Sequence, residues 1–142
     1  MAESLTWVAN QTRPDITNAV RAVAWFSHDP KEIHWKAARK ILECLKTTAH
    51  LGLTYCRDDG VGIEVVLELN AYLDADYAQK ANDRRSVSGA AFFYGGALMT
   101  WFSRTQKSVT LCTTEAEYVA MAEGGKGGIV LKGYLDVLTA RN

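Results

Sequence analysis

The sequence predicts an α+β protein in which helices come first, a small antiparallel sheet follows and a helix comes last. Three observations support this order. Apolar residues recur every three or four positions in the first third, which is typical of a helix buried on one side. Apolar and polar residues alternate over residues 63–76, as in a half-buried strand. Two further strand-like runs flank Gly95–Gly96, a dipeptide suited to a tight hairpin turn.

Helices are expected throughout the first third. One lies in TRPDITNAVRAVAWFS, where Pro14 fits near a helix start because its missing N–H costs nothing there. The next lies in HDPKEIHWKAARKILECLK, with Asp29 as the N-cap and Pro30 at the first helical position. The pattern predicts a buried stripe on this second helix that consists of Ile33, Ala37, Ile41 and Cys44 or Leu45.

The middle of the chain predicts a three-strand antiparallel meander over about residues 63–103. Within GIEVVLELNAYLDADYA, Leu73 points to one face, and Asp74 and Asp76 point to the other. The last segment returns to helix, opened by a capping box at Thr114 and Glu117. The glycines of EGGKGG at 123–128 each cost about 1 kcal/mol relative to alanine in a helix. Either the helix breaks there or packing holds it.

Composition narrows the class of protein. The formal net charge is zero, which argues against a general nucleic-acid binder that relies on many basic residues, although a local basic patch is compatible with it. Lys36 and Lys40 lie mostly away from the buried stripe of their helix, so they form either a solvated face or a phosphate-contacting surface. No membrane-spanning run, signal peptide or metal-type cysteine spacing is present in the sequence. A cytoplasmic or nuclear protein with free thiols, and no membrane partner, is expected.

Paired acids beside apolar residues are the strongest chemical signal. Asp74 and Asp76 stand two apart on a strand, so both side chains leave the same face. Their repulsion would be relieved by a divalent cation, and such oxygen ligands suit Mg²⁺ or Mn²⁺. Glu115 and Glu117 lie about 200° apart around a helix, so only one can join Asp74. Without a metal, Asp76 would be an acidic residue in the turn that ends the strand, and Glu117 would serve in the capping box of the helix.

Five segments together are similar to a known family. TRPDITNAV, HWKAARKILECLKTTAHLGLTY, YLDADYA, DRRSVSG and CTTEAEYVAMAE occur in that order. They resemble the C-terminal part of the polyprotein of copia-type LTR retrotransposons over essentially the whole chain. In that family, residues 1–50 look like the end of the reverse-transcriptase region, and residues 51–142 look like the ribonuclease H domain.

The resemblance implies a ribonuclease H-like fold, a mixed sheet flanked by helices. Such enzymes cut the RNA of an RNA–DNA hybrid with two magnesium ions that four acidic residues hold. Asp74 matches the first acid and Glu117 the second, while Asp76 is a weaker candidate ligand. Arg84 and Arg85 match family residues that we expect to contact backbone phosphate. The other candidate nucleic-acid contacts are Lys36, Lys40 and Lys107.

The chain departs from the family pattern in two ways. It stops at Asn142, before the strand and the later segment that supply the third and fourth acids, so a truncated domain is expected. Asp136 reads as helical and is a poor substitute. In addition, the glycines at 124, 125, 127 and 128 replace residues that form helix in the family. We therefore expect negligible cleavage and weak binding of one Mg²⁺ or Mn²⁺ ion near Asp74 and Glu117.

Three functions follow as hypotheses: an active ribonuclease H completed by other carboxylates, an inactive relic that binds RNA–DNA hybrid, and a protein–protein interaction module. A basic patch would favour the second function, and the zero net charge favours the third. Residues 63–74 contain no proline that would block strand pairing. We therefore expect either the GLTY run at 52–55 to cover this edge or a homodimer to form through it.

Overall fold

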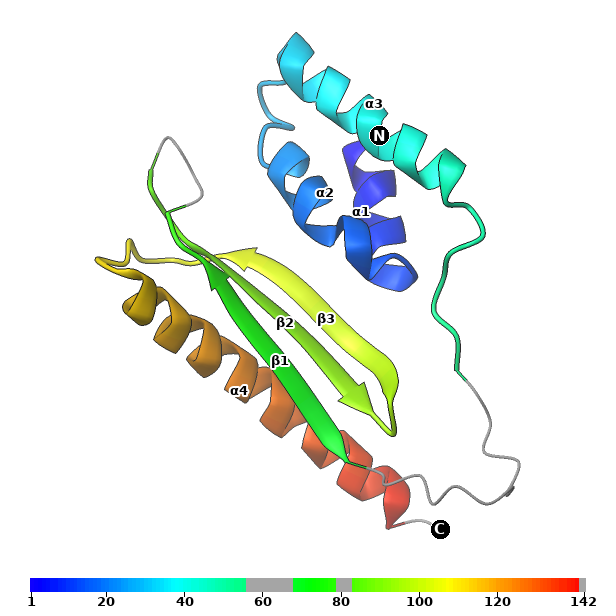
Figure 1. Ribbon diagram of the computed structural model, residues 1–142, viewed down its shortest axis with the longest axis vertical. Helices are drawn as coiled ribbons and strands as arrows, with labels where there is room; N and C mark the ends of the chain where they lie inside the picture. The colour runs from blue at the N-terminus through cyan, green and yellow to red at the C-terminus, as the bar shows by residue number, and fades with distance from the viewer. Residues whose placement is uncertain (56–67, 79–82, 141–142) are drawn as a thin grey trace. The chain divides into compact units, whose positions relative to one another are not determined.

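The computed structural model describes residues 1–55, 68–78 and 83–140 (Figure 1). The chain divides into two compact units, Met1–Tyr55 and Cys56–Asn142. The predicted α+β class is confirmed, because helices and an antiparallel sheet are both present. Residues 63–67 of the predicted first strand lie outside the described residues. Among the helices of the described ranges, none has the length and apolar character needed to cross a membrane.

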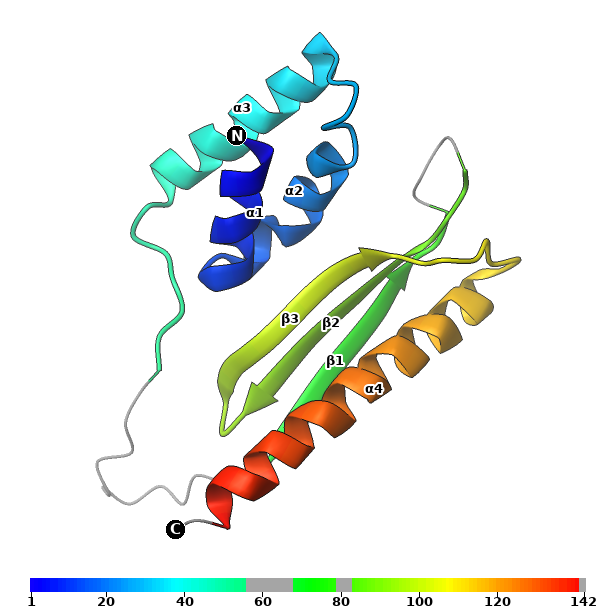
Figure 2. The same cartoon turned by 180° about the vertical axis from the view of Figure 1, so that it is seen from behind.

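The first unit is helical (Figure 2). It contains α1 (Ala2–Gln11), the 3₁₀ turn η1 (Pro14–Ile16), α2 (Thr17–Ala24) and α3 (Glu32–Thr47). Pro14 opens η1, as its fixed φ and missing N–H allow. One apolar core joins the helices, and its fully buried members are Leu5, Ala9, Ile16, Val20, Ala38 and Ile41. Gly52–Tyr55 beyond α3 forms no strand.

The predicted start of α3 was wrong. Lys31 is the N-cap, and its backbone N–H donates to His34 Nδ1 at 3.1 Å. Asp29 belongs instead to the preceding turn, because its N–H donates to the Phe26 carbonyl at 3.2 Å. The buried stripe is correspondingly different. Ala38 and Ile41 are buried with Leu45 packed beside them, whereas the predicted members Ile33 and Cys44 are exposed.

Arg13, the N-cap of η1, ties this turn to Thr48 at the C-terminal end of α3. Its guanidinium is buried and donates to both carboxylate oxygens of Asp15, at 2.9 and 2.7 Å. It also donates to the Thr48 carbonyl at 3.1 Å and to the Thr48 hydroxyl at 2.8 Å. These hydrogen bonds from Arg13 hold the pKa of Asp15 below its usual range. The buried cation thus has an acidic partner and several hydrogen bonds, which limits the cost of its desolvation.

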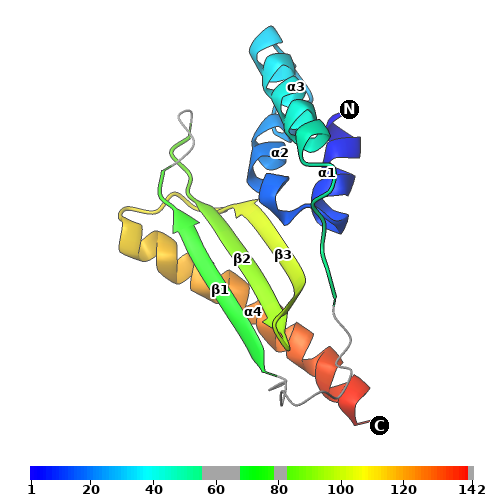
Figure 3. The same ribbon diagram turned by 45° about the vertical axis from the view of Figure 1, so that its right-hand side comes forward.

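The predicted three-strand meander is confirmed (Figure 3). It consists of β1 (Leu69–Asp76), β2 (Val87–Tyr94) and β3 (Ala97–Thr105), antiparallel and in the order β1-β2-β3. Gly95 and Gly96 make the predicted hairpin turn with φ of 55° and 78°. Both values lie in the left-handed region that a type I′ turn requires and glycine adopts freely.

Helix α4 (Thr113–Thr139) runs along one face of the sheet without a break. The glycines are accommodated because the sheet approaches closely on that side. A Cβ built at Gly124 would overlap the Leu73 side chain, and a Cβ at Gly127 would lie 3.3 Å from Phe92 Cζ. Gly128 likewise lies over the Phe92 ring. Packing against one face of the helix therefore offsets the low helix propensity of these residues.

The predicted capping box at Thr114 and Glu117 was wrong. The N-cap is Cys112, whose Sγ accepts from the Glu115 backbone N–H at 3.5 Å. The Glu115 carboxylate accepts from the Leu111 N–H at 2.6 Å. The helix therefore begins at Thr113, and the acid that accepts a backbone N–H at its start is Glu115, which bonds to the residue before the N-cap. This leaves Glu117 free of a capping role.

A buried polar cluster anchors the first turns of α4. Gln106 has no exposed surface, and its Nε2 donates to Ser88 Oγ at 3.0 Å and to the Ala116 carbonyl at 2.8 Å. Its backbone N–H donates to the Ser86 carbonyl at 2.9 Å. The Ser86 hydroxyl in turn meets that of Thr110 at 2.8 Å. Because unsatisfied polar groups are costly when buried, these bonds fix the position of α4 relative to β2.

The close approach at Gly124 predicts opposite effects for two glycine-to-alanine changes in α4. Gly124→Ala should lower the free energy of unfolding by about 1–3 kcal/mol, because Leu73 must move. Gly133→Ala meets nothing within 4 Å, so it should raise stability by up to about 1 kcal/mol through helix propensity alone. Urea unfolding followed by circular dichroism measures both. Equal effects of the two changes would contradict the packing described for Gly124.

The ion pair between Arg13 and Asp15 predicts acid sensitivity of the helical unit. Because the folded-state pKa of Asp15 is lowered, its stabilisation is complete above the ordinary value of about 3.9 and is lost as pH falls through the folded value. Asp15→Asn should reduce stability at neutral pH and flatten this acid dependence. Tryptophan fluorescence can follow the unfolding of the helical unit as pH falls, because Trp7, Trp25 and Trp35 lie in this unit. Asp29→Asn serves as the matched control, and identical pH profiles would contradict the assignment.

Candidate functional site

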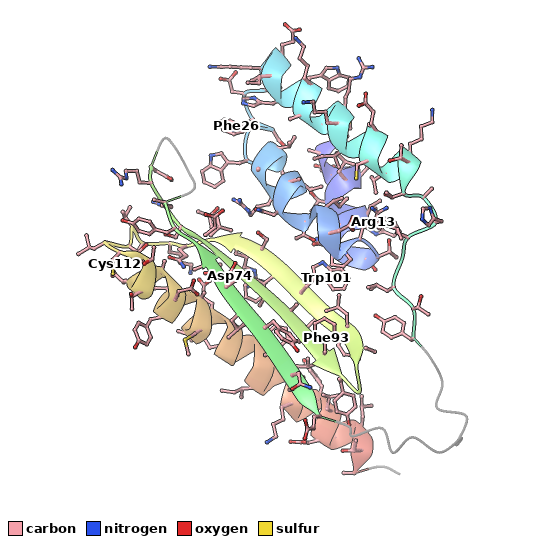
Figure 4. All side chains as sticks on the ribbon, in the orientation of Figure 1. Arg13, Phe26, Asp74, Phe93, Trp101 and Cys112 are labelled. Atoms are coloured by element: carbon pink, nitrogen blue, oxygen red, sulfur yellow. The ribbon has the colours of Figure 1, made fainter. Side chains whose placement is uncertain are left out.

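The predicted acids occupy two elements of the second unit. Asp74 and Asp76 lie on β1 and are exposed, while Glu117 lies in the second turn of α4 and is half-buried. Figure 4 labels Asp74 on β1 and Cys112 at the start of α4. The strand and the helix run in opposite directions, so the end of β1 near Asp76 lies beside the start of α4 (Figure 1).

Strand alternation determines where the two aspartates point. Leu73 faces α4, because it contacts Gly124. The neighbouring Asp74, and Asp76 two residues on, therefore project from the face turned away from α4. Tyr72 shares that face, is 66% exposed and makes an edge-to-face contact with Phe93 at 5.5 Å between ring centroids. The two aspartates thus lie beside an aromatic pair.

A metal site requires several His, Cys, Asp or Glu side chains close together. Over residues 1–55, 68–78 and 83–140, no three His, Cys, Asp or Glu side chains gather closely enough to hold an ion. Asp74 and Asp76 share a face of β1, but Glu117 belongs to the helix behind the opposite face. The arrangement as described does not fit a two-ion centre, which needs several carboxylates around ions about 4 Å apart.

The basic candidates fall into two groups. Arg84 and Arg85 precede β2, and Lys107 follows β3. The backbone bond from Gln106 to Ser86 brings these two segments together at one end of the sheet. Arg84 is exposed and has a φ of 52°. The Arg85 backbone N–H donates to Asp83 Oδ1 at 3.2 Å, and its Nε lies 3.5 Å from Asp83 Oδ2.

The second group belongs to the helical unit. Lys36 pairs with Glu32 at 2.8 Å across one helical turn, with both side chains largely exposed. Lys40 is exposed one turn further along α3. An exposed pair of this kind contributes little to stability, so these lysines are available to other charged groups.

Sequence reasoning missed the buried polar cluster. Ser86 and Ser88 were part of the DRRSVSG motif, but no role was assigned to them. The available signal was the motif itself, because serines two apart point to the same side of a strand. For Gln106 no signal was present, since a glutamine between a strand and a helix usually lies on the surface. Its burial follows from contacts with β2 and α4.

Comparison with curated proteins gives clear relatives. The retrovirus-related Pol polyprotein from transposon TNT 1-94 of Nicotiana tabacum is 39% identical over 95% of this chain, which spans 10% of that protein. The secreted RxLR effector protein 161 of Plasmopara viticola is 36% identical over 84% of this chain and 80% of its own length. The Pol polyprotein from transposon RE1 of Arabidopsis thaliana is 37% identical over 78% of this chain and 7% of its own length.

Two other comparisons found nothing: no protein-family model matches the chain, and no solved structure matches it. The relative from Nicotiana tabacum nevertheless covers 95% of the sequence, which includes both units. Transposon Pol polyproteins from two plants share more than a third of their aligned residues with it. The chain therefore belongs to the family of copia-type, retrovirus-related Pol polyproteins.

Proposed function

We propose that this chain is a ribonuclease H-like domain that binds RNA–DNA hybrid without cutting it on its own. The observation that carries the proposal is the placement of the acids. Asp74 and Asp76 project from one face of the sheet, and Glu117 belongs to the helix on the other face. The carboxylates are therefore divided, and a single weakly held Mg²⁺ or Mn²⁺ ion is the most that Asp74 and Asp76 would recruit.

Hybrid binding is assigned to the basic end of the sheet. Arg84, Arg85 and Lys107 stand at the same end, next to the start of α4. Arg84 and Lys107 are exposed. Arginine and lysine bind phosphates through charge-assisted hydrogen bonds. With zero formal net charge, such a patch gives modest, salt-sensitive affinity.

A cleavage assay tests the catalytic half of the proposal. A labelled RNA–DNA hybrid incubated with the full chain and Mg²⁺ or Mn²⁺ should remain intact, because the carboxylates are divided. Asp74→Asn should leave this result unchanged. Cleavage that needs the metal and disappears in Asp74→Asn would contradict the proposal, since it would show that the acids assemble around the hybrid.

A binding assay tests the other half. Arg84→Ala combined with Arg85→Ala should weaken hybrid binding and lower the slope of log affinity against log salt by about 1 for each phosphate that the variant no longer neutralises. Lys126→Ala combined with Lys132→Ala, on exposed positions of α4, removes the same charge and should change the affinity less. Equal reductions in affinity for the two double variants would show non-specific attraction rather than a site.

A protein–protein interaction module is the second candidate. The relative from Plasmopara viticola is named a secreted effector, and the chain covers 80% of its length. The helical unit has an apolar cavity of about 350 Å³ lined by residues that include Val23, Phe26 and Trp35. Trp25 and Trp35 are each more than half exposed. Failure to bind hybrid, with the fold intact, would favour this function.

A further inference from the structure

We propose that Asp83 is a positioning residue for nucleic-acid binding: its carboxylate holds a tight turn that presents Arg84 to a backbone phosphate, with Lys107 as the second phosphate contact. The same carboxylate restrains Arg85, the next residue along the chain. The inference rests on the proposed binding of hybrid at this end of the sheet. It adds which of the two neighbouring arginines contacts the phosphate and what selects it.

The backbone of Arg84 has an uncommon conformation. Its φ is 52°, in the left-handed region that residues with a side chain adopt rarely and at a cost. Among the described residues, Ala78 is the one other non-glycine residue with a positive φ, and both lie in the connection between β1 and β2. Such conformations persist only where surrounding contacts determine them, and they gather at binding sites. The contacts around Arg84 therefore decide how its side chain is presented.

The Asp83 carboxylate holds this conformation. Its Oδ1 accepts from the Arg85 backbone N–H at 3.2 Å, so the side chain closes a turn around Arg84 in the manner of an Asx-turn. Its Oδ2 lies 3.5 Å from Arg85 Nε. Both carboxylate oxygens are thus directed at Arg85, whose side chain is 40% exposed. Asp83 therefore neutralises and restrains Arg85 while it fixes the backbone of Arg84.

Arg84 differs from Arg85 in exposure and in its charged neighbours. Arg84 is exposed, and within residues 68–78 and 83–140 no carboxylate forms an ion pair with it. A guanidinium binds phosphate through charge-assisted hydrogen bonds that are often paired. A guanidinium that already has a carboxylate partner must give up that partner to do so, which reduces the net gain. The phosphate contact is therefore assigned to Arg84.

Ser86 anchors this turn to the rest of the unit. It has no exposed surface, and its hydroxyl accepts from the Ala78 N–H at 3.1 Å and meets the Thr110 hydroxyl at 2.8 Å. Its carbonyl accepts from the Gln106 N–H at 2.9 Å. Both ends of the β1–β2 connection and the segment after β3 therefore meet at Ser86. Arg84 lies two residues from this buried fixed point.

Lys107 brings the second cation to the same place. It is exposed and directly follows Gln106, whose backbone N–H bonds to Ser86. Gln106 is itself fixed, because its Nε2 donates to Ser88 Oγ at 3.0 Å and to the Ala116 carbonyl at 2.8 Å. The two exposed cations thus belong to backbone segments that buried hydrogen bonds hold together. Groups that are preorganised in this way lose less conformational entropy on binding, which favours affinity.

Asp83 provides a sharp test, because its two effects on binding have opposite signs. Removing an acid from a basic patch raises the affinity for phosphate by charge alone. Removing the acceptor that holds the turn frees the backbone of Arg84, so its ordering opposes binding. Asp83→Ala removes both the charge and the acceptor. Asp83→Asn removes the charge but keeps an Oδ1 acceptor for the Arg85 N–H.

Fluorescence anisotropy of a labelled RNA–DNA hybrid, titrated with the full chain, measures these effects. Asp83→Ala should weaken binding about fivefold, although it makes the chain more positive. Asp83→Asn should bind at least as tightly as the wild type. Circular dichroism should show the same fold for both variants. Unchanged or tighter binding by Asp83→Ala, or equally weakened binding by both variants, would overturn the proposal.

Separate arginine variants identify the phosphate contact and leave the Asp83 carboxylate in place. Arg84→Ala should weaken hybrid binding about tenfold and lower the slope of log affinity against log salt by about 1. Arg85→Ala should lower both the affinity and the slope less, because Asp83 already neutralises Arg85. The reverse ranking, or equal effects of the two variants, would overturn the proposal.

Arg84→Gly tests the backbone conformation itself. Glycine adopts a φ of 52° freely, so Arg84→Gly should unfold at a higher urea concentration than Arg84→Ala, while both variants lose the phosphate contact. A lower urea midpoint for the glycine variant would contradict the turn.

The outcomes separate this inference from the proposed function. Weakened hybrid binding by the double variant of Arg84 and Arg85, with equal effects of the two single variants, would retain hybrid binding at this end of the sheet and overturn the role of Asp83. Unchanged binding by the double variant would overturn both.

Discussion

The close contact between α4 and the sheet is the constraint on which the second unit depends. Gly124 leaves space for Leu73, and Gly127 and Gly128 leave space for the Phe92 ring. A helix of 27 residues with this many glycines would be marginal in water by its own propensity. It persists because these same glycines let the helix bury the apolar face of β1 and β2. The same glycines thus lower the helix propensity of α4 and permit its packing against the sheet.

The buried polar cluster fixes the position of α4 along the strands. Apolar packing alone would allow the helix to slide. Gln106 bonds to Ser88 of β2 and to the Ala116 carbonyl in the first turn of α4. Sliding of the helix would break both bonds within a buried site, where unpaired polar groups are costly. The serines of the DRRSVSG motif therefore have a structural task, whereas Arg84 in the same motif is exposed.

The candidate functional residues of the second unit lie on different parts of its surface. The aspartates of β1 point away from α4, and the basic residues gather at the end of the sheet where α4 begins.

The sequence by itself determined the class, the order of elements and the family. Period-two alternation predicted β1, Gly95–Gly96 predicted the hairpin, and TTEAEY with DRRSVSG marked the Pol relationship, because each signal is local. Only the tertiary structure decided the continuity of α4, its start at Thr113 and the burial of Gln106. It also decided that Leu73, and not Asp74, faces Gly124. These outcomes depend on contacts between segments far apart in the chain, and the spacing of neighbouring residues does not encode them.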